Sequence, residues 1–294
     1  MKPSIAIIIP CYQEEGTIAQ VVRDFKLQLP DASLIVFDNN CTDRTAEFAK
    51  AAGAEVISVP IQGKGHVVDF AFRTVKADIY VMVDGDATYP ANQVFSLLNP
   101  VISGATDMAV GYRKNSDDSL KPLHQLGNRL LCWCINTIFK SKIADIFSGY
   151  RVFSSKCVNQ LSITSHGFDI ETEITLQALY RGLRIQEIEV DYYQRPAGSH
   201  SKLKTISDGS LVLIRAALIV IEYKPLTVFG SAGLLLALAS LLIWGSAFLH
   251  PTIPLFLLAT LASLSALIFL AVGIIIHCLN TRQLELERRL TQLR

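Results

Sequence analysis

The sequence lacks charge over a long stretch near its end, because no Lys, Arg, Asp or Glu lies between Lys224 and Arg282. This stretch contains two apolar segments, residues 226–249 and 253–279, separated by a short turn. Each segment is longer than the ~20 residues that a helix needs to cross a bilayer. A buried hairpin of a soluble protein is the alternative, but two uncharged segments in succession favour a transmembrane hairpin over residues 225–280.

Basic residues are also absent from the turn of this hairpin, whereas they flank both of its outer ends. Cytoplasmic loops of membrane proteins carry an excess of Lys and Arg. We therefore predict an integral membrane protein with both termini in the cytoplasm. The flanking basic residues are Lys202, Lys204, Arg215 and Lys224 before the first span and Arg282, Arg288, Arg289 and Arg294 after the second.

Two shorter segments adjoin the hairpin. Residues 204–224 are strongly apolar, with Asp208, Arg215 and Glu222 at helical spacing. They are expected to form either an amphipathic helix in the membrane interface or an ordinary core helix. Residues 281–294 are charged and are expected to form a short solvated helix, with self-association as the weaker alternative. The hairpin itself offers a surface through which a homo-oligomer could form.

Other absences narrow the class of protein. The formal net charge of +1 provides no basic field, so the composition indicates no nucleic-acid partner. The six cysteines lack zinc-like spacing and the histidines lack metal-ligand spacing, so reduced thiols and ordinary histidines are expected. The apolar run at residues 4–10 is too short for a secretory signal. We therefore expect residues 1–203 to form a cytoplasmic domain.

Within this domain, β-rich runs alternate with amphipathic stretches, which is the pattern of a parallel sheet with crossover helices. Polar residues follow four of the expected strands, and ligands of open α/β sheets bind where strands end. A binding cleft is therefore expected at that edge. The expected strands are 5–9, 34–37, 55–59, 79–83, 108–111 and 185–190, and the expected helices are 17–29, 43–52, 66–75, 91–103, 123–139 and 171–181.

The most informative strand end is Asp84-Gly85-Asp86, which directly follows the apolar run 79–83. Two unpaired carboxylates at the end of a buried strand repel each other, and a hard divalent cation relieves that repulsion. Such a cation also bridges the oxygens of a diphosphate. An Asp-Gly turn is the alternative, because Asp-x-Asp alone is a weak pattern.

Seven motifs in order resemble those of family 2 glycosyltransferases with the GT-A fold. The last three resemble the subgroup that loads a sugar onto a polyprenyl phosphate, such as dolichyl-phosphate mannosyltransferase and its bacterial relatives. The resemblance covers residues 5–204. The motifs are Pro10-x-Tyr12-x-Glu14, Asp38-Asn39-Asn40-x-Thr42-Asp43, Gly63-Lys64-Gly65, Asp84-Gly85-Asp86 with Tyr89-Pro90, Asp145-x-x-Ser148-Gly149-Tyr150-Arg151, Gly167-Phe168-x-x-Glu171-x-Glu173 and Arg195-x-x-Gly198-Ser199-x-Ser201-Lys202.

The resemblance implies an α/β catalytic domain with the Rossmann-like GT-A fold and a mostly parallel mixed sheet, followed by the hairpin, in a bacterial inner membrane. It also implies that Asp84 and Asp86 hold Mg²⁺ or Mn²⁺ on the donor diphosphate, over which Arg195, Ser201 and Lys202 close. The implied nucleotide-binding residues are Pro10, Tyr12, Glu14, Asp38, Asn40, Lys64, Asp84, Gly85 and Asp86.

Several of these residues also have ordinary interpretations. Asp38 at a strand end is equally suited to cap a turn or helix, and Lys64 between two glycines is equally an exposed loop lysine. The loop from Arg195 to Lys202 is equally a basic segment that touches anionic lipid.

The acceptor side also needs positive charge. Arg113, Arg129 and Arg151, together with Ser148, are the candidates for binding the phosphate of a lipid acceptor, although Arg129 is equally a solvated helix residue. A phosphate monoester has its second pKa near ~6 and is mostly dianionic at neutral pH, so it needs positioning more than deprotonation.

The carboxylates near 170 are therefore expected to orient basic groups and the sugar. Glu171 or Asp169 is the best alternative base, and a charged helix start favoured by the macrodipole is the ordinary interpretation. The residues expected to carry catalysis are Asp86, Asp169, Arg151, Glu171, Arg195 and Lys202.

We interpret the chain as an inverting, metal-dependent glycosyltransferase that moves a sugar from a UDP- or GDP-sugar to a polyprenyl phosphate. Resemblance to bacterial members with two spans favours UDP, and glucose or N-acetylglucosamine over mannose. Two alternatives remain at this point. One is transfer to another membrane lipid with Glu171 or Asp169 as base, and the other is a membrane-anchored scaffold with an inactive nucleotide site.

Overall fold

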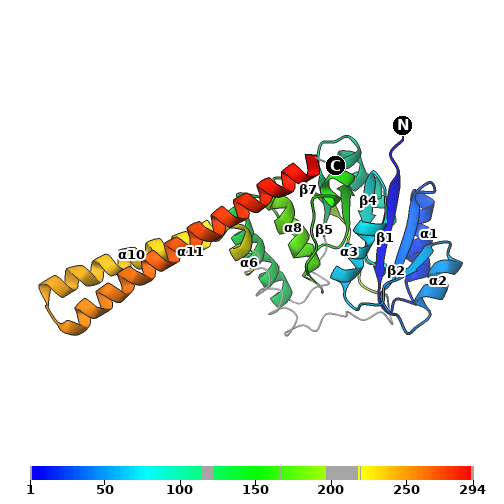
Figure 1. The fold of residues 1–294 in the computed structure, drawn as a ribbon. Helices are drawn as coiled ribbons and strands as arrows, with labels where there is room; N and C mark the ends of the chain where they lie inside the picture. The colour runs from blue at the N-terminus through cyan, green and yellow to red at the C-terminus, as the bar shows by residue number, and fades with distance from the viewer. Residues whose placement is uncertain are drawn as a thin grey trace. The chain divides into compact units, whose positions relative to one another are not determined.

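The computed structural model describes residues 2–113, 122–165, 167, 169–196, 218 and 220–292. The chain divides into two compact units, Met1–Ala216 and Ala217–Arg294. The first contains a mixed sheet, and the second contains two long helices (Figure 1).

The sheet of the first unit has seven strands in the order β3-β2-β1-β4-β6-β5-β7. Parallel pairing joins β1 to β2 and β4, β2 to β3, and β5 to β7, whereas β6 runs antiparallel to both β4 and β5. The strands are β1 Ile5–Cys11, β2 Ser33–Asp38, β3 Glu55–Ser58, β4 Ile79–Met82, β5 Met108–Arg113, β6 Arg151–Ser154 and β7 Ile185–Val190.

Helices cover both faces of this sheet. Successive side chains of a strand point to opposite sides, and both sets of side chains are apolar here, so each face packs against helices. Ile7 and Ile9 of β1 join one buried cluster with α1 and α4, whereas Ala6 and Ile8 join a second cluster with α3 and α8. The helices of this unit are α1 Ile18–Gln28, α2 Thr45–Ala51, α3 Lys64–Thr74, η1 Ala91–Gln93, α4 Val94–Ile102, α6 Pro122–Phe139, α7 Ser155–Val158 and α8 Ile170–Tyr180.

Parallel pairing brings the ends of the central strands to one edge. Cys11 at the end of β1 pairs with Asp38 at the end of β2, and β4 ends next to β1 with Ile8 opposite Met82. The segments that follow β1, β2 and β4 therefore meet at this edge, as the sequence predicted.

The predicted α/β class and mostly parallel mixed sheet are confirmed, and every predicted strand and helix of this unit occurs. Among the described residues of this unit, two elements were missed, β6 and the short helix α7. β6 is four residues long and begins with Arg151, so its sequence has no apolar run of the length expected for a buried strand.

The second unit is a helical hairpin of α10 Pro225–Leu249 and α11 Ile253–Gln292. Pro225–Leu249 and Ile253–Gln283 are long and apolar enough to cross a membrane, with mean hydropathies of 2.2 and 2.5. Most of their leucine and isoleucine surface is exposed, which suits contact with lipid.

Small and polar residues lie where the two helices meet. A Cβ at Gly233 would lie 2.9 Å from Leu270, and the Ser240 and Ser263 hydroxyls are 2.6 Å apart. The sequence suggested that the charged tail forms a separate short helix. In the structure the tail instead continues α11, which ends at Gln292. Most of the expected helix at 204–224 lies outside the described residues.

Candidate active site

Three ion pairs dominate the edge where β4 ends. The Lys64 ammonium lies 2.5 Å from Asp84 Oδ1 and 2.5 Å from Glu171 Oε1, so it bridges the two carboxylates. Arg195 Nη2 lies 2.7 Å from Asp86 Oδ2. The structure thus brings together five residues that the sequence placed in the site, from four separate segments of the chain.

Local turn geometry fixes the buried Asp86 carboxylate. Its Oδ1 accepts hydrogen bonds from the Thr88 hydroxyl at 2.7 Å and the Thr88 N–H at 3.2 Å, and Ala87 between them has a φ of +59°. That left-handed conformation is uncommon for alanine and marks a strained turn. Burial and the neighbouring Asp84 charge raise the pKa of Asp86, and Arg195 opposes this rise.

Two glycines leave room for the Asp84-Gly85-Asp86 turn. A Cβ at Gly85 would lie 2.6 Å from Cys11 Sγ, and a Cβ at Gly149 would lie 2.9 Å from Asp84 Cγ. Thr17 at the start of α1 donates to the Gly85 carbonyl at 2.7 Å. Gly149 lies two residues before the antiparallel strand β6, so the turn that leads into the missed strand supplies the wall behind Asp84.

Lys64 is the first residue of α3, and its side chain is only 12% exposed, so the exposed-loop interpretation is wrong. The buried Asn39 holds the preceding loop. Its amide donates to the carbonyls of Val59 at 3.0 Å and Ile61 at 2.7 Å, and its Oδ1 accepts from the Gly63 N–H at 2.7 Å. Burial alone would lower the pKa of Lys64, but Asp84 and Glu171 hold it well above its usual value.

The other predicted nucleotide residues surround the ends of β1 and β2. Asp38 Oδ1 accepts from the Cys41 N–H at 3.0 Å, which is the turn-capping role, and its contact with the nucleotide stays a prediction. Glu14 is buried, and its N–H donates to Thr45. Tyr12 is 39% exposed beside Pro10 and Cys11 of β1. Asn40 has a φ of +64°, which places it in a tight turn.

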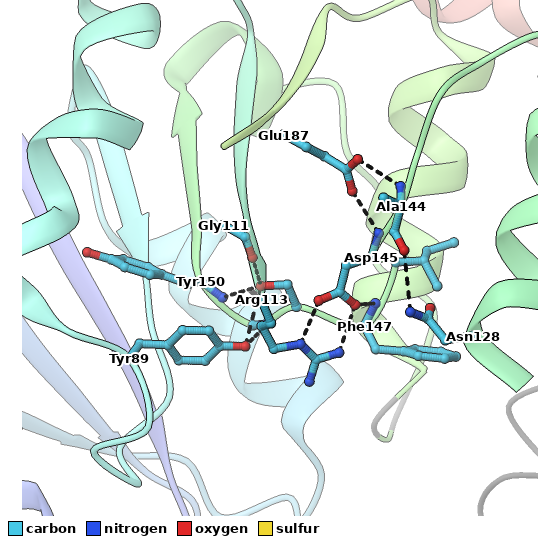
Figure 2. Close-up of polar contacts among 12 residues, drawn as sticks. Tyr89, Gly111, Arg113, Asn128, Ala144, Asp145, Phe147, Tyr150 and Glu187 are labelled. Carbon is cyan, nitrogen blue, oxygen red and sulfur yellow. Dashed lines mark hydrogen bonds and ion pairs between the residues drawn. The ribbon is translucent and has the colours of Figure 1, made fainter. Parts of the chain in front are cut away.

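The end of β5 and the segment that precedes β6 form a second polar cluster (Figure 2). Arg113 pairs with Asp145 through Nε at 2.6 Å and Nη2 at 2.7 Å. Burial opposes a charged guanidinium here, but Asp145 holds the pKa of Arg113 well above its usual value. Glu187 accepts from the N–H groups of Ala144 at 2.7 Å and Asp145 at 2.9 Å, which fixes the segment that carries this carboxylate.

Tyr89 links this second cluster to Asp84. Its hydroxyl accepts from the Gly149 N–H at 3.1 Å and lies 3.3 Å from Ser148 Oγ, which in turn donates to the Gly111 carbonyl at 2.6 Å. Ser148 is fully buried, so it shapes the turn and does not face an acceptor in this structure.

Arg151 does not occupy the position predicted for a phosphate ligand. It is fully buried, and its guanidinium donates to the carbonyls of Ser148 and Ile146, each at 2.8 Å, and to the Thr175 hydroxyl at 2.8 Å. These bonds tie the turn behind Asp84 to α8. The acceptor-phosphate role of Arg151 is therefore corrected to a structural one.

Of the remaining candidates, Asp169 and Glu171 are buried at the start of α8, and Glu171 contacts the site through Lys64. Arg129 is exposed on α6 and lines an open groove of about 580 Å³. Ser201 and Lys202 lie outside the described residues. The other groove residues are Tyr112, Cys132, Trp133, Asn136, Thr137 and Ala144.

Sequence reasoning missed three functions within the site. Asn39 and Tyr89 lie within the seven motifs, but no role was predicted for them. A polar residue next to a strand end indicates that it can anchor a loop. Gly149 also stood in a motif, but its contact with Asp84 depends on a strand pairing that no local pattern revealed.

The chain matches the family model described as Glycosyl transferase family 2 over residues 6–159. It is 34% identical over 233 residues to Glycosyltransferase AglJ of Haloferax volcanii, which covers 78% of this chain and 76% of that protein. It is 24% identical over 209 residues to the dolichyl-phosphate hexose transferase of the same organism, which covers 71% of this chain and 90% of that protein.

Solved structures show the same fold. A Mycobacterium tuberculosis glucosyl-3-phosphoglycerate synthase, in complex with Mn²⁺, UDP-glucose and phosphoglyceric acid, superposes with a TM-score of 0.63 at 18% identity, covering 76% of this chain and 80% of that one. The family match and the similarity to AglJ, on a GT-A sheet with its paired carboxylates at the strand ends, show that this chain belongs to glycosyl transferase family 2 and is a glycosyltransferase.

Proposed function

We propose that this glycosyltransferase moves a sugar from a nucleotide-sugar donor to a polyprenyl phosphate, with inversion, at the cytoplasmic face of a membrane. One observation carries the proposal: the chain that has the Asp84–Asp86 edge also has two apolar helices of membrane-spanning length. A long polyprenyl chain stays in the bilayer, so an enzyme that uses it must be held there. The similarity to a protein named dolichyl-phosphate hexose transferase supports the same acceptor class.

The donor set at this edge fits a divalent cation. Asp84 and Asp86 each face a positive side chain in the structure, which shows that this position accepts positive charge. Among the described residues, no group of three or more Asp, Glu, His or Cys side chains could hold a metal. Mg²⁺ or Mn²⁺ would therefore take its other ligands from the donor diphosphate and water, and would neutralise charge on the leaving diphosphate.

The residues of the chain then orient the reaction. Arg195, together with Ser201 and Lys202 as predictions, binds the diphosphate and stabilises the nucleoside diphosphate as its charge develops. The acceptor phosphate is already dianionic near neutral pH, so it attacks the anomeric carbon without a general base. Glu171 holds Lys64 in place and does not need to accept a proton in this scheme.

The acceptor phosphate is proposed to bind between Arg113 and Arg129. Asp145 engages Nε and Nη2 of Arg113, which leaves Nη1 outside this ion pair. Arg129 lines the groove with the exposed Trp133, so a cation and an aromatic surface lie side by side there. That combination suits the phosphate and first isoprene units of the acceptor.

Incubation of the full-length protein in detergent with polyprenyl phosphate and a panel of UDP- and GDP-sugars tests the proposal. A lipid product whose mass equals polyprenyl phosphate plus one sugar is expected with one donor, and only when a divalent metal is present. Polyprenol without the phosphate is the matched control and should give no product. No product from any donor, with a folded protein, would contradict the proposal.

A second candidate is transfer to a lipid hydroxyl, which would need a base. The position of Glu171 favours this second candidate, because this buried carboxylate shares the Lys64 ammonium with Asp84. Glu171→Gln separates the two mechanisms. A loss of several orders of magnitude in kcat, with unchanged folding and donor affinity, would support a base; a small loss supports the phosphate nucleophile.

A further inference from the structure

Lys64 contacts a carboxylate that the proposed metal ion also needs. Its ammonium contacts Asp84 Oδ1 at 2.5 Å, and this carboxylate is one of the two that the proposed metal needs. A carboxylate oxygen that holds an ammonium at this distance cannot at the same time hold a metal ion on the same side. A metal ion that binds this side of Asp84 Oδ1 must therefore displace Lys64.

Glu171 gives Lys64 a second anchor. The same ammonium lies 2.5 Å from Glu171 Oε1, and Glu171 is itself buried at the start of α8. Lys64 can therefore give up Asp84 and still keep an anionic partner. The fixed loop before it, held by Asn39, limits this movement to the side chain.

The charges of this cluster favour joint binding of metal and donor. Asp84, Asp86 and Glu171 carry three negative charges, and Lys64 and Arg195 carry two positive ones. A divalent cation adds two positive charges, and the diphosphate of a nucleotide sugar adds two negative ones. Either alone shifts the balance of a largely buried cluster by two charges, whereas both together leave it unchanged.

Resting on the proposed function, we infer that Lys64 is an internal competitor for the metal: it occupies Asp84 in the donor-free protein and moves to the donor diphosphate when metal and nucleotide bind together. This arrangement keeps the donor-free protein from retaining metal. Metal binding at Asp84 then depends on the nucleotide sugar being bound, and Lys64 is a positioning residue for both the metal and the donor.

The test measures Mn²⁺ binding to full-length protein in detergent by calorimetry, without nucleotide and with UDP or GDP. Lys64→Met removes the charge and keeps much of the side-chain volume. In the absence of nucleotide, this variant should bind Mn²⁺ at least about tenfold more tightly than wild type, since a unit charge about 4 Å from a divalent cation repels it by that much even in water. With nucleotide, the variant should lose this advantage and bind the nucleotide more weakly.

Controls separate this inference from the proposed function. Lys156→Met removes a lysine from an ion pair with Asp107 elsewhere in the domain and should leave Mn²⁺ affinity at the wild-type value. If Lys64→Met unfolds, Lys64→Met combined with Glu171→Gln removes the unpaired anion, and this double variant should bind Mn²⁺ without nucleotide at least about tenfold more tightly than Glu171→Gln alone. Unchanged nucleotide-free Mn²⁺ affinity in a folded variant would overturn the inference. Wild type that binds no Mn²⁺ even with UDP or GDP would instead count against the proposed donor site.

Discussion

Replacing Gly149 by alanine should damage the proposed metal site without removing any charged group. The new Cβ would lie 2.9 Å from Asp84 Cγ and 3.0 Å from Oδ1, and closer still to Oδ2. Non-bonded carbon atoms separate by about 3.5 Å or more, so the carboxylate must retreat by at least about 0.5 Å. Asp84 cannot retreat freely, because Lys64 holds its Oδ1.

The carboxylate oxygen Oδ2 lies nearer to the new Cβ than Cγ does and must move farther, and displacements approaching about 1 Å at a reacting centre reduce rates steeply. A misplacement of about 1 Å can reduce a rate about 100-fold, which corresponds to about 2.7 kcal/mol of transition-state stabilisation. We therefore expect Gly149→Ala to lower kcat/KM by about 100-fold and to raise the metal concentration needed for half-maximal rate. The measurement is sugar transfer as a function of Mn²⁺ concentration, with thermal unfolding recorded on the same samples.

Gly16→Ala is the matched control, because a Cβ at Gly16 would meet no heavy atom within 4 Å. It should keep the wild-type rate and metal dependence. If Gly149→Ala also keeps both, then Asp84 either does not bind the metal or tolerates the shift, and the reasoning from the close contact is refuted.

Three further variants test the surrounding structure. Hydrogen bonds from Arg184 hold the pKa of Asp107 below its usual value, so Asp107→Asn should reduce the free energy of unfolding by about 1–2 kcal/mol at pH 7. This difference should shrink as the pH falls below about 4, where the carboxyl of the unfolded chain becomes protonated. Thermal unfolding at several pH values measures it, and a difference that does not depend on pH would contradict the assignment. Asn39→Leu leaves the carbonyls of Val59 and Ile61 and the Gly63 N–H without their side-chain partner. It should lower the free energy of unfolding in urea by about 2–3 kcal/mol and raise the KM for the donor. An unchanged KM would show that this loop does not affect donor binding. Arg151→Met should lower stability by about 3 kcal/mol without changing the KM for polyprenyl phosphate, and a raised KM would restore the acceptor role that burial argues against.

Local patterns predicted much of the fold because the strands of a doubly covered sheet are short apolar runs with polar ends. The run before Asp84 is one example, and its burial on both faces follows from the alternation of side chains along the strand. The motifs likewise placed Asp84, Asp86, Lys64, Glu171 and Arg195 in one site. In the structure these side chains lie close together through three ion pairs.

What local patterns did not predict depends on contacts between distant segments. β6 has only four residues, and its pairing with β4 and β5 decides its conformation more than its own composition does. Arg151 was predicted to bind the acceptor phosphate because its Ser-Gly-Tyr-Arg motif resembles that of the polyprenyl-phosphate subgroup. Its burial is stabilised by two backbone carbonyls and Thr175, partners that sequence spacing does not reveal.

The reversed direction of β6 has a consequence for the order of folding. β6 pairs with β4 on one side and β5 on the other, so it joins the half of the sheet that contains β1–β4 to the half that contains β5 and β7. Until residues 149–154 have left the ribosome and inserted, β4 presents an open edge and Asp84 has no wall behind it. The carboxylate site is therefore incomplete until β6 joins the two halves of the sheet.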